Sequence, residues 1–136
     1  MVHNDFSPHN LLVDTSGTLT GILDFGDVVR TAVVFDLAIA LSNLLRADAE
    51  DLWAAPLAWL RGYVRVRPVP DEELALLPLL CTARLVQRAL IASWRAQRDP
   101  ARAAYVLSHA SRDWATAHAA RTGLDTTADR ILEVRR

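Results

Sequence analysis

Residues 1–27 read MVHNDFSPHNLLVDTSGTLTGILDFGD. They contain the pattern H-x-D-x-x-x-x-N, formed by His3, Asp5 and Asn10, and an Asp-Phe-Gly triplet that begins at Asp24. A carboxylate that can accept a hydroxyl proton is thus followed by an amide oxygen and a second carboxylate, two groups that suit a divalent metal ion. The alternative is a surface turn that is simply rich in Asp and Asn, because both residues favour turns.

Two short apolar runs separate the first half of this pattern from the second. Residues 10–13 and 18–23 flank Asp14-Thr15-Ser16-Gly17, whose Asp, Ser and Gly are turn formers. We therefore predict an antiparallel β-hairpin. Antiparallel pairing would bring Asn10, at the start of one strand, next to Asp24, at the end of the other. Two residues that are distant in the sequence could then bind one ion.

The order of these residues is the one in which protein kinases carry their catalytic loop and metal-binding turn. The runs H-N-D-F-S-P-H-N-L-L-V-D, G-I-L-D-F-G-D and F-D-L-A-I-A-L resemble, more specifically, the aminoglycoside phosphotransferase and choline kinase superfamily and its hydroxylysine kinase branch. In that superfamily a Pro lies inside the catalytic loop and a D-L-A follows the metal-binding turn. The resemblance is close over residues 2–45 and loose over the remainder.

The resemblance implies a role for each polar residue of the pattern. Asp5 is the predicted catalytic residue, which orients and deprotonates the acceptor hydroxyl, and Asn10 and Asp24 are the predicted Mg²⁺ ligands. His3 is expected to hold the loop by packing or hydrogen bonding, and Asp36 to accept hydrogen bonds from the loop backbone. Asp36 could instead be a carboxylate that complements the start of a helix. The implied cofactors are Mg²⁺ and ATP, and the residues that bind the nucleotide stay unassigned.

The implied activity is ATP-dependent phosphorylation of a hydroxyl on a small molecule, with an amino alcohol or a hydroxy amino acid as the expected substrate. The family needs an N-lobe with a phosphate-covering loop and a strand Lys, whereas only Met1 and Val2 precede His3 and the chain contains no Lys. Residues 1–136 are therefore expected to be the C-terminal, catalytic-loop part of a phosphotransferase domain. Without its N-lobe this part should be inactive, and it should expose apolar surface that self-associates or binds the missing half.

Composition argues against several other classes of protein. The net charge of −1 gives no basic excess for nucleic acid, and the fifteen cations, all Arg, fit a compositional bias better than a binding patch. No charge-free apolar stretch reaches the length of a membrane span, and no secretion signal is recognisable. The single cysteine, Cys81, fits a protein of the reducing cytoplasm.

The rest of the sequence predicts helices around an apolar core. Residues 33–46 are apolar almost all round, as in a helix buried on most sides, and the four Trp residues are expected to anchor the core. The predicted fold class is α+β and mainly helical: a protein-kinase-like C-lobe fragment in which a short β-hairpin carries the catalytic loop. Further helices are expected over residues 51–66, 79–98, 102–121 and 127–135. A short helical turn is expected over residues 71–77, with Asp71 as the N-cap of the run that begins at Glu72.

Three alternatives stay open. His3, Asp5 and His9 could form part of a zinc site, although the spacing supplies no further soft ligands. The chain could be a non-catalytic module that docks on another chain through an exposed apolar face and has no metal dependence. A kinase that acts on proteins would need an activation segment, for which the interval between Gly26 and Asp36 is too short.

Overall fold

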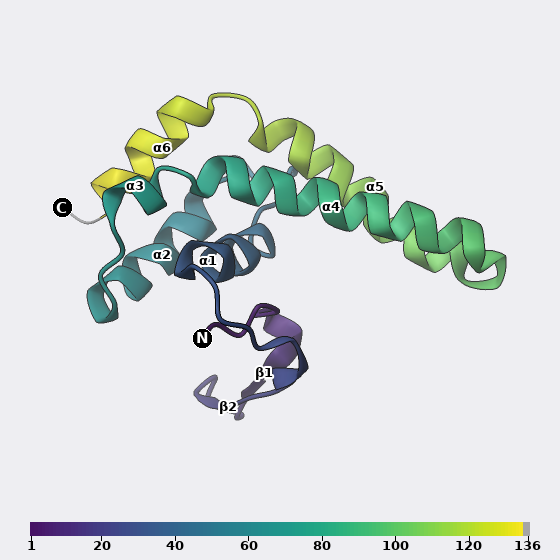
Figure 1. Ribbon diagram of the computed structural model, residues 1–136, viewed down its shortest axis with the longest axis horizontal. Helices are drawn as coiled ribbons and strands as arrows, with labels where there is room; N and C mark the ends of the chain where they lie inside the picture. Colours follow the sequence, from purple (N-terminus) through teal and green to yellow (C-terminus); the bar gives the residue numbers. More distant parts are fainter. Residues whose placement is uncertain (135–136) are drawn as a thin grey trace.

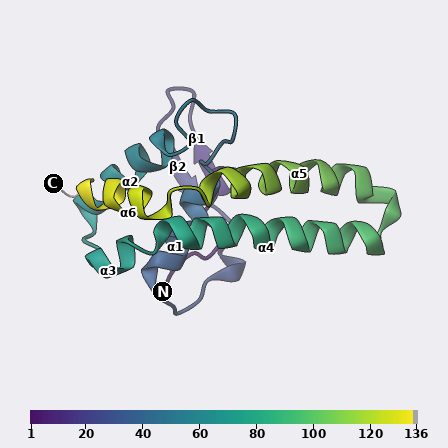
Figure 2. The same ribbon diagram turned by 90° about the horizontal axis from the view of Figure 1, so that it is seen from above.

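A β-hairpin projects from one side of a helical body in the computed structural model, which describes residues 1–134 other than the side chain of residue 109 (Figure 1). Two of the helices, α4 and α5, run antiparallel and extend well beyond the rest of the molecule (Figure 2). The mainly helical class with one short hairpin therefore agrees with the sequence prediction. The elements are β1 (Leu11–Val13), β2 (Leu19–Ile22), α1 (Val33–Ser42), α2 (Ala54–Val66), α3 (Asp71–Leu74), α4 (Leu77–Arg98), α5 (Ala103–Ala120) and α6 (Leu124–Glu133).

The hairpin forms where the sequence predicts it. Strand β1 pairs antiparallel with β2, with Leu11 opposite Ile22 and a bulge after Leu12. The Asp14 side chain closes the turn by accepting hydrogen bonds from the backbone N–H groups of Ser16 and Thr18, each at 2.9 Å. The turn residues thus act through the local side-chain bonding that makes Asp and Ser favourable there.

Helix α1 is the centre of the core, as its apolar sequence predicts. Leu37 and Leu41 are only 1% and 0% exposed, and they pack in one cluster with Leu60 of α2 and Cys81 of α4. The buried part of α1 is therefore covered within the chain and does not belong to an exposed apolar face. Burial also raises the pKa of the Cys81 thiol to about 12.

Several boundary and packing predictions were wrong. Asp71 is the first residue of α3 and not its N-cap, since Pro70 occupies the cap position. Helix α6 begins three residues early, at Leu124, because Gly123 adopts the left-handed conformation (φ +69°) directly before it. Trp94 and Trp114 are 53% and 43% exposed, so neither is a buried anchor of the core.

One helical stretch, Asp71–Arg98, is long and apolar enough to cross a membrane by length and composition alone. Its residues Leu74, Leu77, Cys81 and Leu85 lie in the core cluster and are at most 1% exposed. This packing is typical of the central helix of a folded domain, and such a stretch is weak evidence for a membrane span.

Candidate active site

Backbone hydrogen bonds hold both ends of the loop that contains His3, Asp5 and Asn10. Near its start, Val2 and Val29 exchange backbone hydrogen bonds of 2.9 and 3.2 Å. At its end, the Leu23 N–H donates to the Asn10 carbonyl at 2.8 Å. The loop therefore lies against both the hairpin and the segment that follows the Asp-Phe-Gly triplet.

Asp36, in the first turn of α1, binds the loop backbone directly. Its Oδ1 accepts a hydrogen bond from the Asn4 N–H at 2.7 Å, and its Oδ2 accepts one from the His3 N–H at 3.3 Å. Asn4 has a φ of +64°, a conformation that non-glycine residues rarely adopt and that needs support from the surroundings. A carboxylate that only complemented the start of the helix would make neither of these bonds. Asp36 thus shapes the loop one residue before Asp5.

His3 joins the loop to the end of the hairpin. Its ring is buried, and Nε2 lies 2.9 Å from the Leu23 carbonyl, to which it donates. The imidazole also packs on Phe25, at 5.0 Å between ring centres, and edge-on against Phe6 at 5.9 Å. These contacts restrain the backbone immediately before Asp24.

Asp5 and Asn10 lie together. The Asn10 Nδ2 donates to the Asp5 backbone carbonyl at 2.9 Å and to the Asp5 Oδ2 at 3.1 Å, and both residues are half-buried. This bond orients the Asp5 carboxylate. Because the amide nitrogen faces Asp5, the amide oxygen of Asn10 is the end of the side chain that could bind a metal ion.

Asp24 lies at the other end of the hairpin, in the left-handed conformation with φ 58° and ψ 68°. Its side chain is exposed, and its Oδ1 would lie 3.3 Å from a Cβ atom on Gly26, so a glycine there leaves room for the carboxylate. Asp24 follows Leu23, the residue that pairs with Asn10. Two hard oxygen donors from Asn10 and Asp24 fit Mg²⁺, which binds through few protein ligands and keeps several waters. No group of three or more described His, Cys, Asp or Glu side chains could hold a metal ion, so the structure does not favour the zinc alternative.

A second set of polar contacts, which the sequence did not indicate, connects the loop to α4 and α5. Arg88 of α4 donates to both carboxylate oxygens of Asp113 on α5 and to the Asn43 Oδ1, the latter at 2.6 Å. Asn43 in turn donates to the carbonyls of Ile39 and, more weakly at 3.5 Å, Phe6. The long helix pair is therefore linked to the loop through the end of α1.

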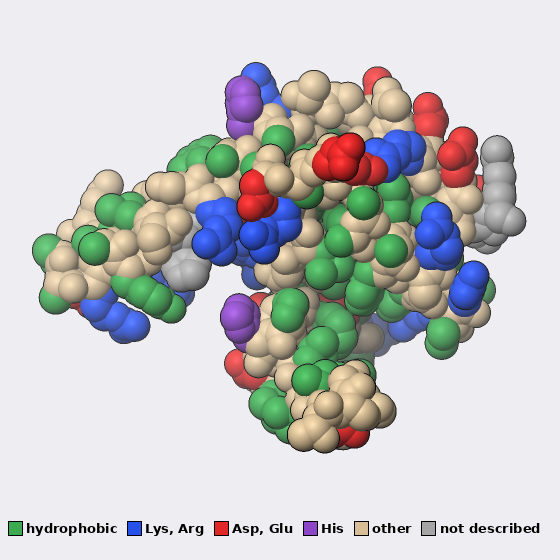
Figure 3. Space-filling model, turned by 180° about the vertical axis from the view of Figure 1, so that it is seen from behind, with side chains coloured by type: hydrophobic (Ala, Val, Ile, Leu, Met, Phe, Trp, Pro, Cys, Tyr) green, Lys and Arg blue, Asp and Glu red, His purple; other side chains and the backbone are tan. Residues whose placement is uncertain are grey.

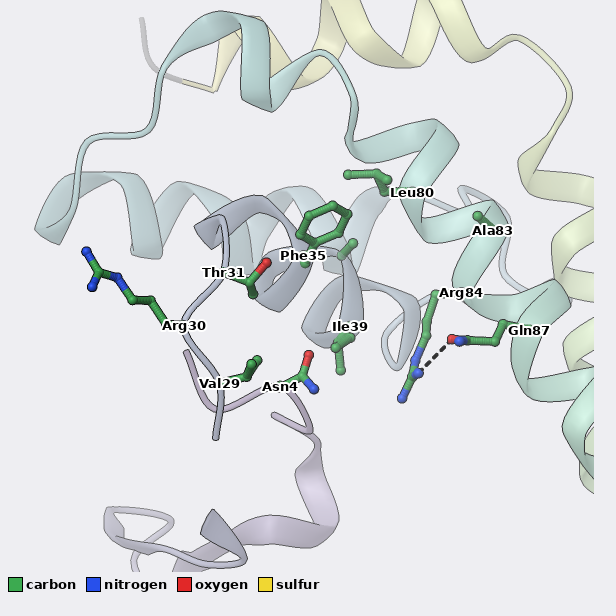
Figure 4. A pocket seen from close by; sticks show the side chains of 11 residues that line it. Asn4, Val29, Arg30, Thr31, Phe35, Ile39, Leu80, Ala83, Arg84 and Gln87 are labelled. Atoms are coloured by element: carbon green, nitrogen blue, oxygen red, sulfur yellow. Dashed lines mark hydrogen bonds between the residues drawn. The ribbon is translucent and has the colours of Figure 1, made fainter. Parts of the chain in front are cut away.

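A pocket of about 680 Å³ opens beside the loop (Figure 4). Asn4 lines it from the loop, Phe35 and Ile39 from α1, and Arg84 and Gln87 from α4. The sequence analysis named none of these residues. Arg84 is distant in the sequence from the loop, and its neighbours carry no local pattern that marks a site.

Comparison with known proteins gives consistent matches to one family. Residues 1–72 match the model of a family described as the phosphotransferase enzyme family. The chain is 29% identical over 121 residues to the hydroxylysine kinase of Xenopus laevis, covering 82% of this chain and 32% of that protein. It is 33% identical over 89 residues to the homoserine kinase of Gluconobacter oxydans, covering 63% and 27%. The chain thus spans about a third of the length of the curated relatives it matches. No solved structure matches it significantly.

Proposed function

The chain belongs to the phosphotransferase enzyme family, and we propose on this premise that it carries the catalytic loop of a small-molecule kinase. The proposed reaction transfers the γ-phosphoryl group of ATP to a hydroxyl of the substrate. The observation that carries the proposal is the contact between the Asn10 amide and the Asp5 carboxylate, in a loop that Asp36 holds by its backbone.

Asp5 is the proposed catalytic residue. One of its carboxylate oxygens accepts the hydrogen bond from Asn10. The other accepts none from the residues that the structure describes, so it can accept one from the substrate hydroxyl. Asp5 then orients the hydroxyl oxygen toward the phosphoryl group and takes its proton as the new P–O bond forms and the bond to the leaving diphosphate breaks. Asp36 and His3 act through the loop and do not touch the reacting atoms.

Asn10 and Asp24 are the proposed Mg²⁺ ligands, through one amide oxygen and one carboxylate. When bound, ATP would supply the phosphoryl group, and Mg²⁺ would neutralise the negative charge on its oxygens. The pairing of β1 with β2 and the hydrogen bond from the Leu23 N–H to the Asn10 carbonyl support the pairing of these two proposed ligands, since they adjoin the paired strands.

A hydroxy amino acid is the proposed substrate class. The matched relatives are named as hydroxylysine and homoserine kinases, and both of these compounds carry a hydroxyl, an α-amino group and a carboxylate.

We also propose that residues 1–136 form the catalytic-loop part of a larger enzyme, whose nucleotide-binding part is supplied by other residues. The coverage of the relatives and the absence of Lys support this. A further support is the apolar surface of the hairpin region, visible at the bottom of Figure 3. Val13, Leu19 and Phe25 are 62%, 51% and 61% exposed, which suits a surface that another part of the enzyme, or a second copy, covers.

The proposal is tested by assaying ATP-dependent phosphorylation of L-homoserine and 5-hydroxylysine. The chain should be assayed alone and together with the polypeptide encoded upstream of residue 1. We expect turnover only in the second case, because the part that positions ATP is then present. Turnover by the 136-residue chain alone, lost on Asp5→Asn, would mean that the chain builds its own nucleotide site.

A further inference from the structure

The pocket beside the loop has the size and lining of a small-molecule site. Its walls are mainly apolar, with Phe35 and Ile39 on one side and Leu80 on the other, and its volume is about 680 Å³. Figure 4 shows the Asn4 side chain on the loop and, across from it, the Arg84 and Gln87 side chains on α4. Arg30 and Thr31, from the segment before α1, also line the pocket. An apolar cleft that contains a guanidinium suits a molecule that has one anionic end.

Arg84 is a cation without an anionic partner among the residues that the structure describes. Its Nη1 donates to the Gln87 Oε1 at 2.8 Å, while its Nε is buried and has no hydrogen-bond partner. A guanidinium carries five N–H donors and stays protonated in proteins, so the buried Nε–H of this half-buried side chain is a donor that a ligand could use. Leaving the buried Nε–H without an acceptor is unfavourable, and an anion in the pocket would provide that acceptor.

The electrostatics connect Arg84 to the candidate catalytic residue. Burial lowers the pKa of Arg84, the nearby Arg88 lowers it further, and the carboxylates of Asp5 and Asp27 raise it. Asp5 therefore contributes to the electrostatic environment of Arg84, although the two are not among the ion pairs of the described residues. Asn4, which lines the pocket, is the residue directly before Asp5. A molecule bound at Arg84 thus lies next to the catalytic loop.

We propose that Arg84 binds the carboxylate of the acceptor substrate while the substrate hydroxyl lies at Asp5. The planar guanidinium matches a carboxylate with two parallel hydrogen bonds, and the apolar walls suit the methylene groups between the two ends of the substrate. The inference rests on the proposed kinase function and assigns to Arg84 the selection of hydroxy acids over amino alcohols.

Binding can be measured without any phosphoryl transfer. The 136-residue chain is titrated by NMR with L-homoserine and with 3-amino-1-propanol, which is the same molecule without its carboxylate. We expect homoserine to bind about 10- to 100-fold more tightly, the worth of a hydrogen-bonded charge pair, and to shift the Arg84 Nε–H signal. Arg84→Gln should abolish the difference. Arg95→Gln, an exposed arginine of the same helix, should retain it. Equal binding of the two compounds by the unmodified chain would overturn the proposal.

Kinetics of the complete enzyme separate this inference from the proposed function. Arg84→Gln should raise KM for homoserine with little change in kcat, because the contact is made equally in the ground state and the transition state. An equal fall in kcat for homoserine and aminopropanol would overturn the proposal by assigning Arg84 to the phosphate of ATP. If the protein binds homoserine more tightly than aminopropanol but phosphorylates neither, the kinase function alone is refuted. If it phosphorylates the two compounds equally well, this inference alone is refuted. If Arg84→Gln does not fold, Arg84→Lys is the second variant. It keeps the charge but should reduce the preference for homoserine over aminopropanol. An unchanged preference in Arg84→Lys would count against the proposal.

Discussion

Asp36→Asn is the substitution that most sharply tests how the loop is held. The change keeps the size of the side chain but removes its charge, and it replaces one of the two oxygens that accept from Asn4 and His3 with an amide nitrogen. A hydrogen bond to a charged group contributes roughly 1.5–3 kcal/mol, and the amide oxygen can retain part of the shorter bond. We therefore expect the loop to lose about 1–3 kcal/mol of stability against local opening, which is about 5- to 150-fold in the opening equilibrium.

Hydrogen exchange of the His3 and Asn4 amides measures this opening directly, since both N–H groups are the donors in question. We expect both amides to exchange faster in Asp36→Asn, by the factor above, while amides in the core of α4 change less. Asp129→Asn, an exposed change on α6, is the matched control and should leave exchange at the loop unaltered. If the two amides kept their full protection in Asp36→Asn, the inference that Asp36 holds the loop would be refuted.

Three further predictions concern the core and the surface. Arg88→Ala leaves the buried Asp113 carboxylate without its partner. The free energy of unfolding, measured in urea, should therefore fall by about 2–4 kcal/mol. A fall below about 1 kcal/mol would show that the Arg88–Asp113 ion pair is dispensable. Burial raises the Cys81 pKa from 9.0 to about 12, so the thiol binds its proton more tightly in the folded state than in the unfolded state. The stabilisation that results from this difference should be complete below pH 9 and should decline as the pH rises toward 12. Comparison with Cys81→Ala, which should lack this component, checks it. The chain should self-associate in light scattering, Phe25→Ser should reduce the association, and a clean monomer would contradict a role for the exposed hairpin surface.

The features that local sequence controls could be predicted. The hairpin follows from two apolar runs around Asp14 and Gly17, and the buried α1 follows from its nearly continuous apolar sequence. The residues proposed for the site were found because they form a compact pattern near one end of the chain. Their roles in catalysis and metal binding stay predictions.

The features that depend on tertiary contacts could not be predicted. The positive φ of Asn4 requires a carboxylate from a helix more than thirty residues later. Arg84 lines the pocket only because α4 packs beside α1 and the loop. Trp94 and Trp114 are large apolar residues, but the packing of α4 and α5 leaves them 53% and 43% exposed.

The central claim, that this chain carries the catalytic residue of a small-molecule kinase, is tested most directly by the effect of Asp5→Asn on phosphoryl transfer. The chain is assayed with ATP, Mg²⁺ and L-homoserine or 5-hydroxylysine in the presence of the polypeptide encoded upstream of residue 1, with Asp129→Asn as the control. The account predicts that Asp5→Asn lowers kcat by about 10²- to 10⁴-fold, the usual worth of a general base, while the melting temperature stays close to that of the unmodified chain. Phosphorylation at an undiminished rate by Asp5→Asn would contradict it.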